Sequence, residues 1–361
     1  MSADTPTFQE KMIAILNHGA LNLAMGLGYR LGLFEVMDAE RRPRTAAHIA
    51  AEAGLDPRYV EEWLGVMVCG RIVELVAGDD GAPRFLLPEA HGNVLARRAG
   101  SDNLGVYTQE IPLLTACAMT AVLKGFASGE GIPYANYPEF HDFMAQLGDA
   151  KHRRVLVETF LPSVDDGRMV EALRHGIDVC DLGCAQGVAT ILMARAFPQS
   201  RFTGIDISVE ALDAARREAR HSGMGNVRFE CRDAVELSRS DDLAGTFDYV
   251  TAFDAIHDQT RPMQALNGVH ALLKANGAFS MIDIAADSHM DGNRSHPMGP
   301  FLYAVSLMHC MPVGLVEGGA GLGMMWGRQL AERMLTRAGF RQVTVAEIPG
   351  DPFNLHFFCR P

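Results

Sequence analysis

The 361-residue sequence predicts an α/β protein in which a mainly helical N-terminal part precedes an open, largely parallel sheet. A small-residue turn, residues 181–187, separates a short apolar run from a segment of helical character. Further short apolar runs follow at intervals typical of βα units. Two last runs, residues 342–348 and 354–358, predict an antiparallel hairpin at the end of the sheet.

The first βα unit indicates a ligand. Residues 177–182 are apolar, the turn follows, and residues 188–197 have helical character. The next apolar run, residues 202–205, ends in Asp206. At the first crossover of an open α/β sheet, glycines let the chain approach a ligand, and an acid at the tip of the next strand accepts both ribose hydroxyls. This order therefore predicts an adenosine-containing cofactor, with an ordinary βα turn as the alternative.

The residues of the turn distinguish between such cofactors. A dinucleotide site needs Gly-x-Gly-x-x-Gly to receive a pyrophosphate, whereas this turn reads Asp-x-Gly-x-Ala-x-Gly from Asp181 to Gly187. The Asp181 carboxylate would repel a diphosphate but suits the ammonium of an amino-acid-bearing ligand. The pattern resembles motif I of class I S-adenosylmethionine-dependent methyltransferases, with Ala185 where that family often has glycine.

The later segments follow the strand order of the same family. Residues 226–230, 247–254 and 278–284 read as strands, and residues 272–277 resemble the family's turn before the fifth strand. The resemblance covers residues 170–361 and implies a class I methyltransferase Rossmann-like sheet with a C-terminal antiparallel hairpin. It also implies that S-adenosyl-L-methionine is the cofactor and S-adenosyl-L-homocysteine the product. The cofactor contacts it implies, with Asp206 at the ribose and Asp233 at the adenine, are Asp181, Gly183, Cys184, Ala185, Gly187, Asp206, Ile207, Asp233, Ala234 and Phe253.

A candidate catalytic residue, His257, follows the fourth strand of the sheet. Substrate and cofactor meet at this edge, and a histidine there can take a proton from an attacking hydroxyl at neutral pH. The His257-Asp258 pair resembles the His-Asp-Trp segment of plant-type small-molecule O-methyltransferases, although Gln259 replaces the tryptophan and the expected acidic partner is not evident. The alternative is that His257 caps the next helix or lines the pocket.

The N-terminal part predicts helices followed by a short β-hairpin. Residues 8–38 are apolar at helical spacing, Thr45 is an expected N-cap, and a helix is expected from Pro57 to Cys69. The order is a winged-helix pattern, which raises a DNA-binding regulator as a rival. Residues 1–100 hold ten Lys and Arg against thirteen Asp and Glu, a net −3, so phosphate neutralisation is not expected. The module resembles that of bacterial regulator-like methyltransferases and implies a homodimer interface and a wall of the substrate cavity.

Length and composition predict two domains. We expect a winged-helix-like dimerisation and substrate-wall domain over residues 1–100. A helical linker and pocket segment covers 101–168, and a cofactor-binding methyltransferase domain covers 169–361. No uninterrupted apolar run approaches the length of a membrane span, no signal peptide is expected, and seven cysteines without a CxxC pair suit a cytoplasmic protein.

The substrate pocket is the least specified part of the prediction. A Gly/Pro/aromatic connection, residues 125–140, and a Met-rich segment, residues 289–327, are candidates to cover an apolar pocket. The alternatives are a packed linker for the first segment and ordinary core packing of the methionines for the second. The pocket residues we expect are Asp254, Tyr134, Tyr137, Met308 and Trp326. No histidine or cysteine pair in these segments has the short spacing of a preformed metal site, so no metal is expected.

The sequence therefore predicts methyl transfer from S-adenosylmethionine to a small organic acceptor, with oxygen favoured over nitrogen, sulfur or carbon. Nucleic acid and membrane are not expected partners. A cofactor-sensing winged-helix regulator and a non-methylating descendant of the fold remain as alternatives.

Overall fold

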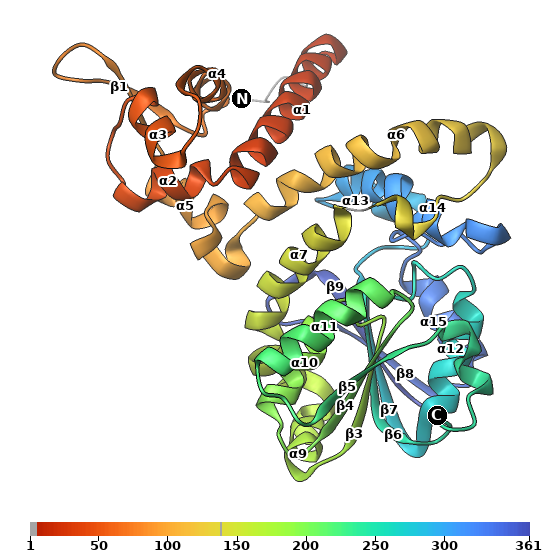
Figure 1. Cartoon of the computed structure of the whole chain (residues 1–361). Helices are drawn as coiled ribbons and strands as arrows, with labels where there is room; N and C mark the ends of the chain where they lie inside the picture. Colours follow the sequence, from red (N-terminus) through yellow and green to blue (C-terminus); the bar gives the residue numbers. More distant parts are fainter. Residues whose placement is uncertain (1–5, 138) are drawn as a thin grey trace, which may run out of the picture. The chain divides into compact units, whose positions relative to one another are not determined.

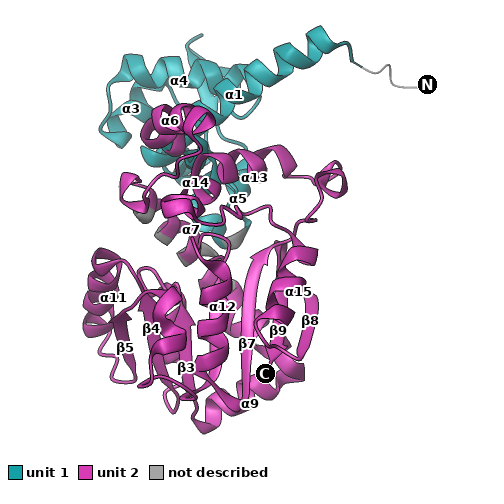
Figure 2. Ribbon diagram, turned by 90° about the vertical axis from the view of Figure 1, so that its right-hand side faces the viewer, with its two compact units in different colours: residues 1–113 teal, residues 114–361 magenta. Residues whose placement is uncertain are grey.

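The computed structural model describes residues 6–137 and 139–361. The chain divides into two compact units, Met1–Leu113 and Leu114–Pro361, coloured separately in Figure 2. The middle segment predicted over residues 101–168 is thus divided between the two units.

Unit 1 has the predicted helices followed by a hairpin. Thr45 accepts a hydrogen bond from the backbone N–H of His48, and Asp56 accepts from the first turn of the next helix, so both helices begin at capped residues. Its elements are α1 (Phe8–Arg30), α2 (Leu33–Glu40), α3 (Ala46–Ala53), α4 (Pro57–Cys69), β1 (Glu74–Ala77), β2 (Pro83–Leu86), α5 (Glu89–Leu95), η1 (Arg97–Asp102) and η2 (Gly105–Gln109). The strands pair antiparallel, with Glu74 opposite Leu86. The predicted helix-turn-helix and wing are confirmed.

The apolar run of residues 8–38 forms two helices because the chain turns at Gly32, whose φ of 71° lies in the left-handed region. Trp63 of α4 joins the first helix to the core of the unit. Its indole N–H donates to the Ala24 carbonyl at 2.8 Å, and its ring packs edge-on to Phe34 at 5.5 Å. A Cβ at position 28 would lie 2.4 Å from the Trp63 ring, so α1 can pack this closely against Trp63 only because residue 28 is glycine.

Unit 2 is built on a seven-stranded sheet in the order β5-β4-β3-β6-β7-β9-β8 (Figure 1). Its strands are β3 (Asp178–Leu182), β4 (Arg201–Asp206), β5 (Val227–Cys231), β6 (Phe247–Phe253), β7 (Leu273–Ile284), β8 (Gln342–Ile348) and β9 (Asp351–Arg360). The first five strands in this order are parallel, and β9 and β8 are antiparallel to their neighbours. The predicted Rossmann-like sheet with a C-terminal hairpin is confirmed, although β7 begins at Leu273, five residues earlier than expected.

Helices cover both faces of this sheet. Val179 of β3 packs with α9 and α10, whereas its neighbour Cys180 packs with α12 and α15, because successive side chains of a strand point to opposite faces. The helical elements are α6 (Glu110–Ser128), η3 (Tyr134–Asn136), α7 (Phe140–Val155), η4 (Leu156–Phe160), α8 (Leu161–Ser163), η5 (Val164–Gly167), α9 (Arg168–His175), α10 (Val188–Ala196), α11 (Val209–His221), η6 (Ala234–Arg239), α12 (Pro262–Leu272), η7 (Met290–Asn293), α13 (Gly299–Val305), η8 (Ser306–Cys310), α14 (Met311–Gly314), η9 (Val316–Gly318) and α15 (Arg328–Arg337).

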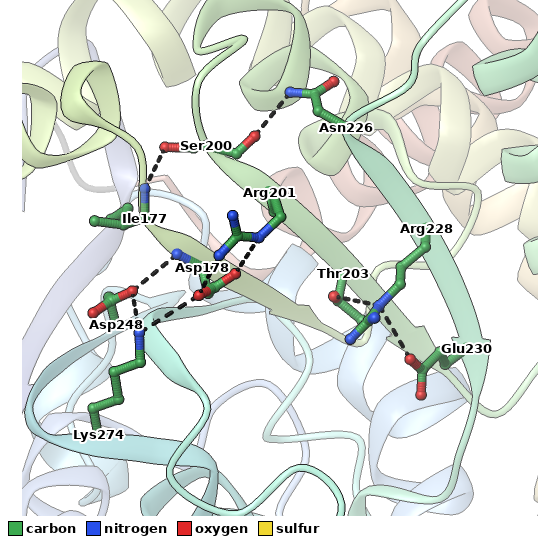
Figure 3. A network of polar contacts seen from close by, with 10 residues as sticks. All are labelled: Ile177, Asp178, Ser200, Arg201, Thr203, Asn226, Arg228, Glu230, Asp248 and Lys274. Carbon is green, nitrogen blue, oxygen red and sulfur yellow. Dashed lines mark hydrogen bonds and ion pairs between the residues drawn. The ribbon is translucent and has the colours of Figure 1, made fainter.

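Polar side chains connect the amino ends of the parallel strands (Figure 3). The Asp178 carboxylate accepts two hydrogen bonds from Arg201, at 2.8 and 2.9 Å. Lys274 lies 2.8 Å from Asp248, which also accepts the backbone N–H of Asp178. This polar network, defined here as Asp178, Arg201, Asp248 and Lys274, ties β3, β4, β6 and β7 together at one edge.

The order of the strands predicts a ligand-binding site at the opposite end of the sheet, where the carboxyl ends of the parallel strands lie. From β3 the chain adds β4 and then β5 on one side, and afterwards crosses to add β6 and β7 on the other. The loops that leave β3 and β6 therefore diverge at the carboxyl ends of these two strands. Ligands of open α/β sheets bind in the crevice that such a divergence creates.

One continuous helix, residues 105–128 formed by η2 and α6, is long and apolar enough to cross a membrane, with a mean hydropathy of 1.5. The sequence led us to expect none, since it has no continuous apolar stretch of about 18 residues. Core helices of water-soluble proteins share this length and composition, so the feature alone assigns no membrane.

Candidate functional site

The turn after β3 has the backbone geometry predicted for a ligand-binding loop. Gly183 and Gly187 have φ of 72° and 74°, in the left-handed region. A Cβ at Gly183 would lie 2.4 Å from the Cβ of Ala255, and one at Gly187 would lie 2.6 Å from the Phe229 ring. Ala185, where the related motif has glycine, also has a positive φ, 45°. The strain at this alanine follows from the loop being held in a glycine-like conformation.

Asp206 connects this turn to β4. Its Oδ2 accepts the backbone N–H of Ala185 at 2.8 Å, and its Oδ1 accepts that of Ser208 at 2.8 Å. The N–H groups of Gly183 and Cys184 donate to the Ile205 carbonyl at 2.8 and 3.1 Å. These N–H groups are therefore committed within the protein, whereas a diphosphate site presents its N–H groups to the ligand. The turn fits an amino-acid-bearing nucleoside better than a dinucleotide.

Asp181 lies beneath the turn and is buried. Its two oxygens accept the hydroxyl protons of Thr190 at 2.6 Å and Thr251 at 2.9 Å, which joins β3 to α10 and β6. Burial raises the pKa of Asp181 to about 6, against the opposing effect of these two hydrogen bonds. A carboxyl group at this place is costly to ionise, and a nearby cation would lower that cost.

The other predicted cofactor contacts lie at the same edge of the sheet or just beyond it. Asp233 follows β5, is exposed, and accepts the backbone N–H of Val235 at 2.9 Å. Ile207 is exposed directly after Asp206, while Cys184 and Ala234 are buried. The half-buried Phe253 ring ends β6 and contacts the His152 ring at 4.9 Å. The role of each residue toward a cofactor stays a prediction.

His257 lies buried in the loop after β6. Its Nδ1 is 2.8 Å from Asp283 Oδ1, and its Nε2 is 3.4 Å from Asp258 Oδ1. A carboxylate can only accept, so the Nδ1–H donates to Asp283. Burial acts to lower the pKa of His257, but the charges of Asp283 and Asp258 outweigh it and raise that pKa well above its ordinary value.

His257 does not cap the helix that follows. That helix, α12, begins at Pro262 and has no side-chain hydrogen bond at its N-cap, Arg261. The loop instead directs the His257 ring inward, toward the end of β7. Asp254, at the start of the loop, has a φ of 51°, a left-handed value that is uncommon outside glycine and that asparagine and aspartate adopt more readily than other residues.

The acidic partner that the sequence did not reveal is Asp283, near the end of β7. It is buried in a strand that is otherwise apolar from Phe279 onward except for Ser280. A buried charge is costly unless it is paired. A lone acid in such a strand was therefore the available signal that it pairs with a residue elsewhere.

Cys310 is a second neighbour of His257 that sequence reasoning did not identify. It ends η8, a π-helix, and its Sγ lies 3.5 Å from Nδ1 of the adjacent His309. Burial, followed by the charge of Asp258, raises the pKa of Cys310 to about 12. π-helices are rare and are often found at functional sites.

The predicted pocket residues differ in their placement. Tyr134 keeps 36% of its surface exposed, and desolvation of its hydroxyl, followed by the charges of Asp258 and Asp206, raises its pKa. Tyr137 is buried, donates its hydroxyl to the Met308 carbonyl at 2.8 Å, and packs against the His309 ring at 4.7 Å. Trp326 lies in the hydrophobic core formed with α12 and α15. Contact of these residues with a substrate stays a prediction.

Two family models match the chain. Residues 173–314 match a methyltransferase domain, and residues 19–97 match an Rv2258c-like winged HTH domain. The fold and these two matches define a chain that combines the class I S-adenosylmethionine-dependent methyltransferase fold with an N-terminal winged-helix domain.

Among curated proteins, the chain is similar to a tRNA (guanine-N(7)-)-methyltransferase of Yersinia enterocolitica, 31% identical over 111 residues that cover 28% of this chain and 46% of that one. It is also similar to a ubiquinone biosynthesis O-methyltransferase of Actinobacillus pleuropneumoniae, 30% identical over 118 residues that cover 32% and 50%. The matched segment thus spans about half the length of these relatives. Among solved structures, human N-acetylserotonin methyltransferase superposes with a TM-score of 0.70 and 16% identity, covering 100% of this chain and 99% of that one. This last likeness establishes the fold.

Proposed function

We propose that the protein transfers a methyl group from S-adenosyl-L-methionine to the hydroxyl of a small organic molecule. The observation that carries this proposal is the buried His257–Asp283 pair, 2.8 Å apart, at the carboxyl edge of the sheet that also bears the turn after β3. A paired histidine at this edge supplies the base that a hydroxyl acceptor needs.

The charge of the site supports a cationic cofactor. Several carboxyl groups lie at or just after the carboxyl ends of the parallel strands, among them those of Asp206, Asp233, Asp254, Asp258 and Asp283. S-adenosylmethionine carries a sulfonium as well as an ammonium, and acidic surroundings favour such a ligand over a phosphorylated one. Asp206 would accept from the ribose hydroxyls, Asp233 from the adenine amino group, and Asp181 would stabilise the amino-acid end from beneath the turn.

The cofactor, when bound, supplies an electrophilic methyl group, and the protein supplies position and a proton acceptor. Asp283 accepts the Nδ1–H of His257, so in the neutral form of the imidazole Nε2 can take the proton of the acceptor hydroxyl. Because the pKa of His257 is raised, this neutral form increases as the pH rises, and so should the rate of methyl transfer. Asp283 also stabilises the imidazolium that results. Because in-line transfer needs the two reacting atoms held close together, most of the rate enhancement comes from positioning.

A small-molecule acceptor is favoured over nucleic acid. The chain has a net charge of −12, and on α4, the helix expected to enter DNA, Arg58 pairs with Glu62 on an exposed face. A phosphate backbone is bound by unpaired basic groups, and this helix offers adjacent acids instead. A regulator that senses the cofactor and binds DNA through the winged helix of unit 1 is therefore the weaker candidate.

We further propose that the protein acts as a cytoplasmic homodimer. The helix α1 and its C-cap residue together expose eight large apolar side chains: Phe8, Met12, Ile13, Ile15, Leu16, Leu23, Leu27 and Leu31. Exposed apolar surface of this extent is typical of protein–protein interfaces, and homodimers are the commonest oligomers. All seven cysteines are free thiols, which suits a reducing compartment.

The test is formation of S-adenosylhomocysteine when the purified protein meets S-adenosylmethionine and small-molecule fractions of cell extracts. Wild type is compared with Asp206→Ala and His257→Ala. Product from wild type that is lost in both variants supports the proposal. Activity retained by His257→Ala would refute the role of His257 as the base, but not the methyltransferase activity. Cofactor binding without product in every extract would favour the sensor or the non-methylating descendant.

A further inference from the structure

Three metal-ligating side chains converge beside the proposed base. A ring nitrogen of His257, a carboxylate oxygen of Asp258 and the Sγ of Cys310 all lie within 4.8 Å of one another. His257 and Cys310 are buried, and Asp258 is 26% exposed. The first two residues follow β6, whereas Cys310 ends η8, so the cluster forms only when the chain folds.

The spacing of the first two ligands fits a shared ion. His257 Nε2 and Asp258 Oδ1 are 3.4 Å apart, longer than an ordinary N–H···O hydrogen bond. This Oδ1 atom is buried and has no hydrogen-bond partner among the described residues. Zinc bonds of about 2.05 Å to nitrogen and 2.1 Å to oxygen at tetrahedral angles hold those two atoms about 3.4 Å apart. The pair is spaced as two ligands of one metal ion.

The groups around these ligands are those of a metal site. A histidine that binds a metal through one ring nitrogen usually donates its other N–H to a carboxylate, and His257 Nδ1 meets Asp283 at 2.8 Å. Cys310 Sγ has a polar neighbour of its own, since His309 Nδ1 lies 3.5 Å away. Both ligands are therefore oriented by a second residue.

The donor set selects the class of metal. One imidazole, one thiolate and one carboxylate favour zinc and similar borderline-soft divalent ions, whereas magnesium and calcium prefer oxygen ligands. Three protein ligands leave a fourth position open, as in catalytic zinc sites. A second grouping, Glu40 with His48 and Glu52, lies on the surface of unit 1, and its two acids pair with Arg42 and Arg44. It has none of these features.

We propose that His257, Asp258 and Cys310 bind one Zn²⁺ ion, and that this ion competes with the acceptor proton for Nε2 of His257. Binding releases the thiol proton of Cys310 and, from the protonated imidazole, the Nε2 proton of His257 to solvent, and it forms bonds from nitrogen, oxygen and sulfur to zinc. A zinc-bound Nε2 has no lone pair for a proton, so the loaded protein is an inhibited state. The binding site stands independently of the proposed function, and only the inhibition rests on it.

The test uses the full chain, freed of metal with a chelator, and Co²⁺ alone as the spectroscopic probe. We expect one equivalent to bind with the intense visible bands of tetrahedral cobalt and a sulfur-to-cobalt charge-transfer band, both abolished by Zn²⁺. Cys310→Ser should lose the charge-transfer band, and Asp283→Asn should weaken binding about 10- to 100-fold. The matched control, Cys69→Ser with Cys231→Ser, removes the two exposed thiols and should retain the band.

A charge-transfer band that survives in Cys310→Ser, or that disappears in the control, would overturn the assignment, as would the absence of stoichiometric binding in wild type. Asp258→Asn provides an independent variant, and loss of tetrahedral bands there supports the site. Inhibition is read separately: Zn²⁺ should slow S-adenosylhomocysteine formation by wild type, and a chelator should restore it. Full activity at saturating Zn²⁺ would refute the proposal that zinc competes with the acceptor proton for Nε2 of His257. Because cobalt binding needs no turnover, a failure of the proposed function leaves this test intact.

Discussion

The two ends of the parallel strands in unit 2 use acidic residues in opposite ways. At the amino ends, the carboxylates of the polar network pair with Arg201 and Lys274 and connect four strands (Figure 3). At the carboxyl ends, Asp206 accepts backbone N–H groups and Asp283 accepts from His257. The backbone there also adopts left-handed conformations at Ala185 and Asp254. One edge is arranged for stability, and the other holds strained backbone and costly charges that a ligand would relieve.

The largest effect is expected from Asp283→Asn at the carboxyl edge. Loss of the carboxylate removes the group that orients His257 and stabilises its charged form. We expect the kcat of methyl transfer to fall about 10²- to 10⁴-fold, with little change in cofactor affinity. Steady-state kinetics and calorimetry measure the two quantities, and Asp283→Glu should recover part of the rate. A rate close to that of wild type would refute the role of the pair.

The next effect concerns Asp181, on the same strand as Asp178. Its folded pKa of about 6 lies above the unfolded value near 3.9, so the stability that it contributes is complete below about pH 4 and is lost as pH rises to about 6. The loss is on the order of 3 kcal/mol. Asp181→Asn should therefore be more stable than wild type above pH 6, and the difference should disappear near pH 4. Urea unfolding across this range measures it, and a difference independent of pH would contradict the assignment.

Asp178→Ala should change stability in the opposite direction. Burial acts to raise the pKa of Asp178, but its pairing with Arg201 and Lys274 outweighs this and lowers the pKa, so the charged form stabilises the fold. We expect a loss of about 1–2 kcal/mol in the free energy of unfolding, with kcat unchanged. Asp241→Ala removes an exposed carboxylate at a position without a positive φ and is the matched control. A fall in kcat without a loss of stability would mean that the two edges are not distinct in function.

The smallest effect is expected from Arg228→Met. Arg228 is 63% exposed and lies 3.2 Å from Glu230 at the outer strand β5. Exposed ion pairs contribute about 0–1 kcal/mol, so unfolding should shift within that range. The shift should shrink further in high salt. A larger loss would show that stabilising polar contacts like those of the polar network also extend to the outermost strand, β5.

The sequence predicted the parts of the fold that local chemistry decides. Thr45 and Pro57 mark helix starts that the structure confirms, because caps and proline act on adjacent backbone. The strands before Gly183 and Asp206 were also located within one or two residues. The break of the first helix at Gly32 was missed, because a single glycine within an apolar run does not reveal a left-handed turn.

The candidate site was predicted in part for the same reason. The turn from Asp181 to Gly187 is continuous in sequence, so its pattern could be recognised. The neighbours of His257 could not, since Asp283 and Cys310 come from β7 and η8, and only the pairing of strands and the packing of the π-helix bring them near. The spacing of residues along the chain does not predict contacts between side chains that are far apart in sequence.

The π-helix η8 has a consequence for how related chains can diverge. A π-turn contains one residue more than an α-helical turn at the same position. Deletion of one residue between Ser306 and Cys310 would therefore restore a regular α-helix. The flanking residues would keep their places, because the deletion removes the residue that the π-turn holds in excess, and only the side chains of the turn would be repositioned. Cys310, which ends the turn, would then lose its place beside His257 and Asp258. A one-codon deletion, rather than a series of substitutions, is thus enough to change the surroundings of His257 in a single evolutionary step.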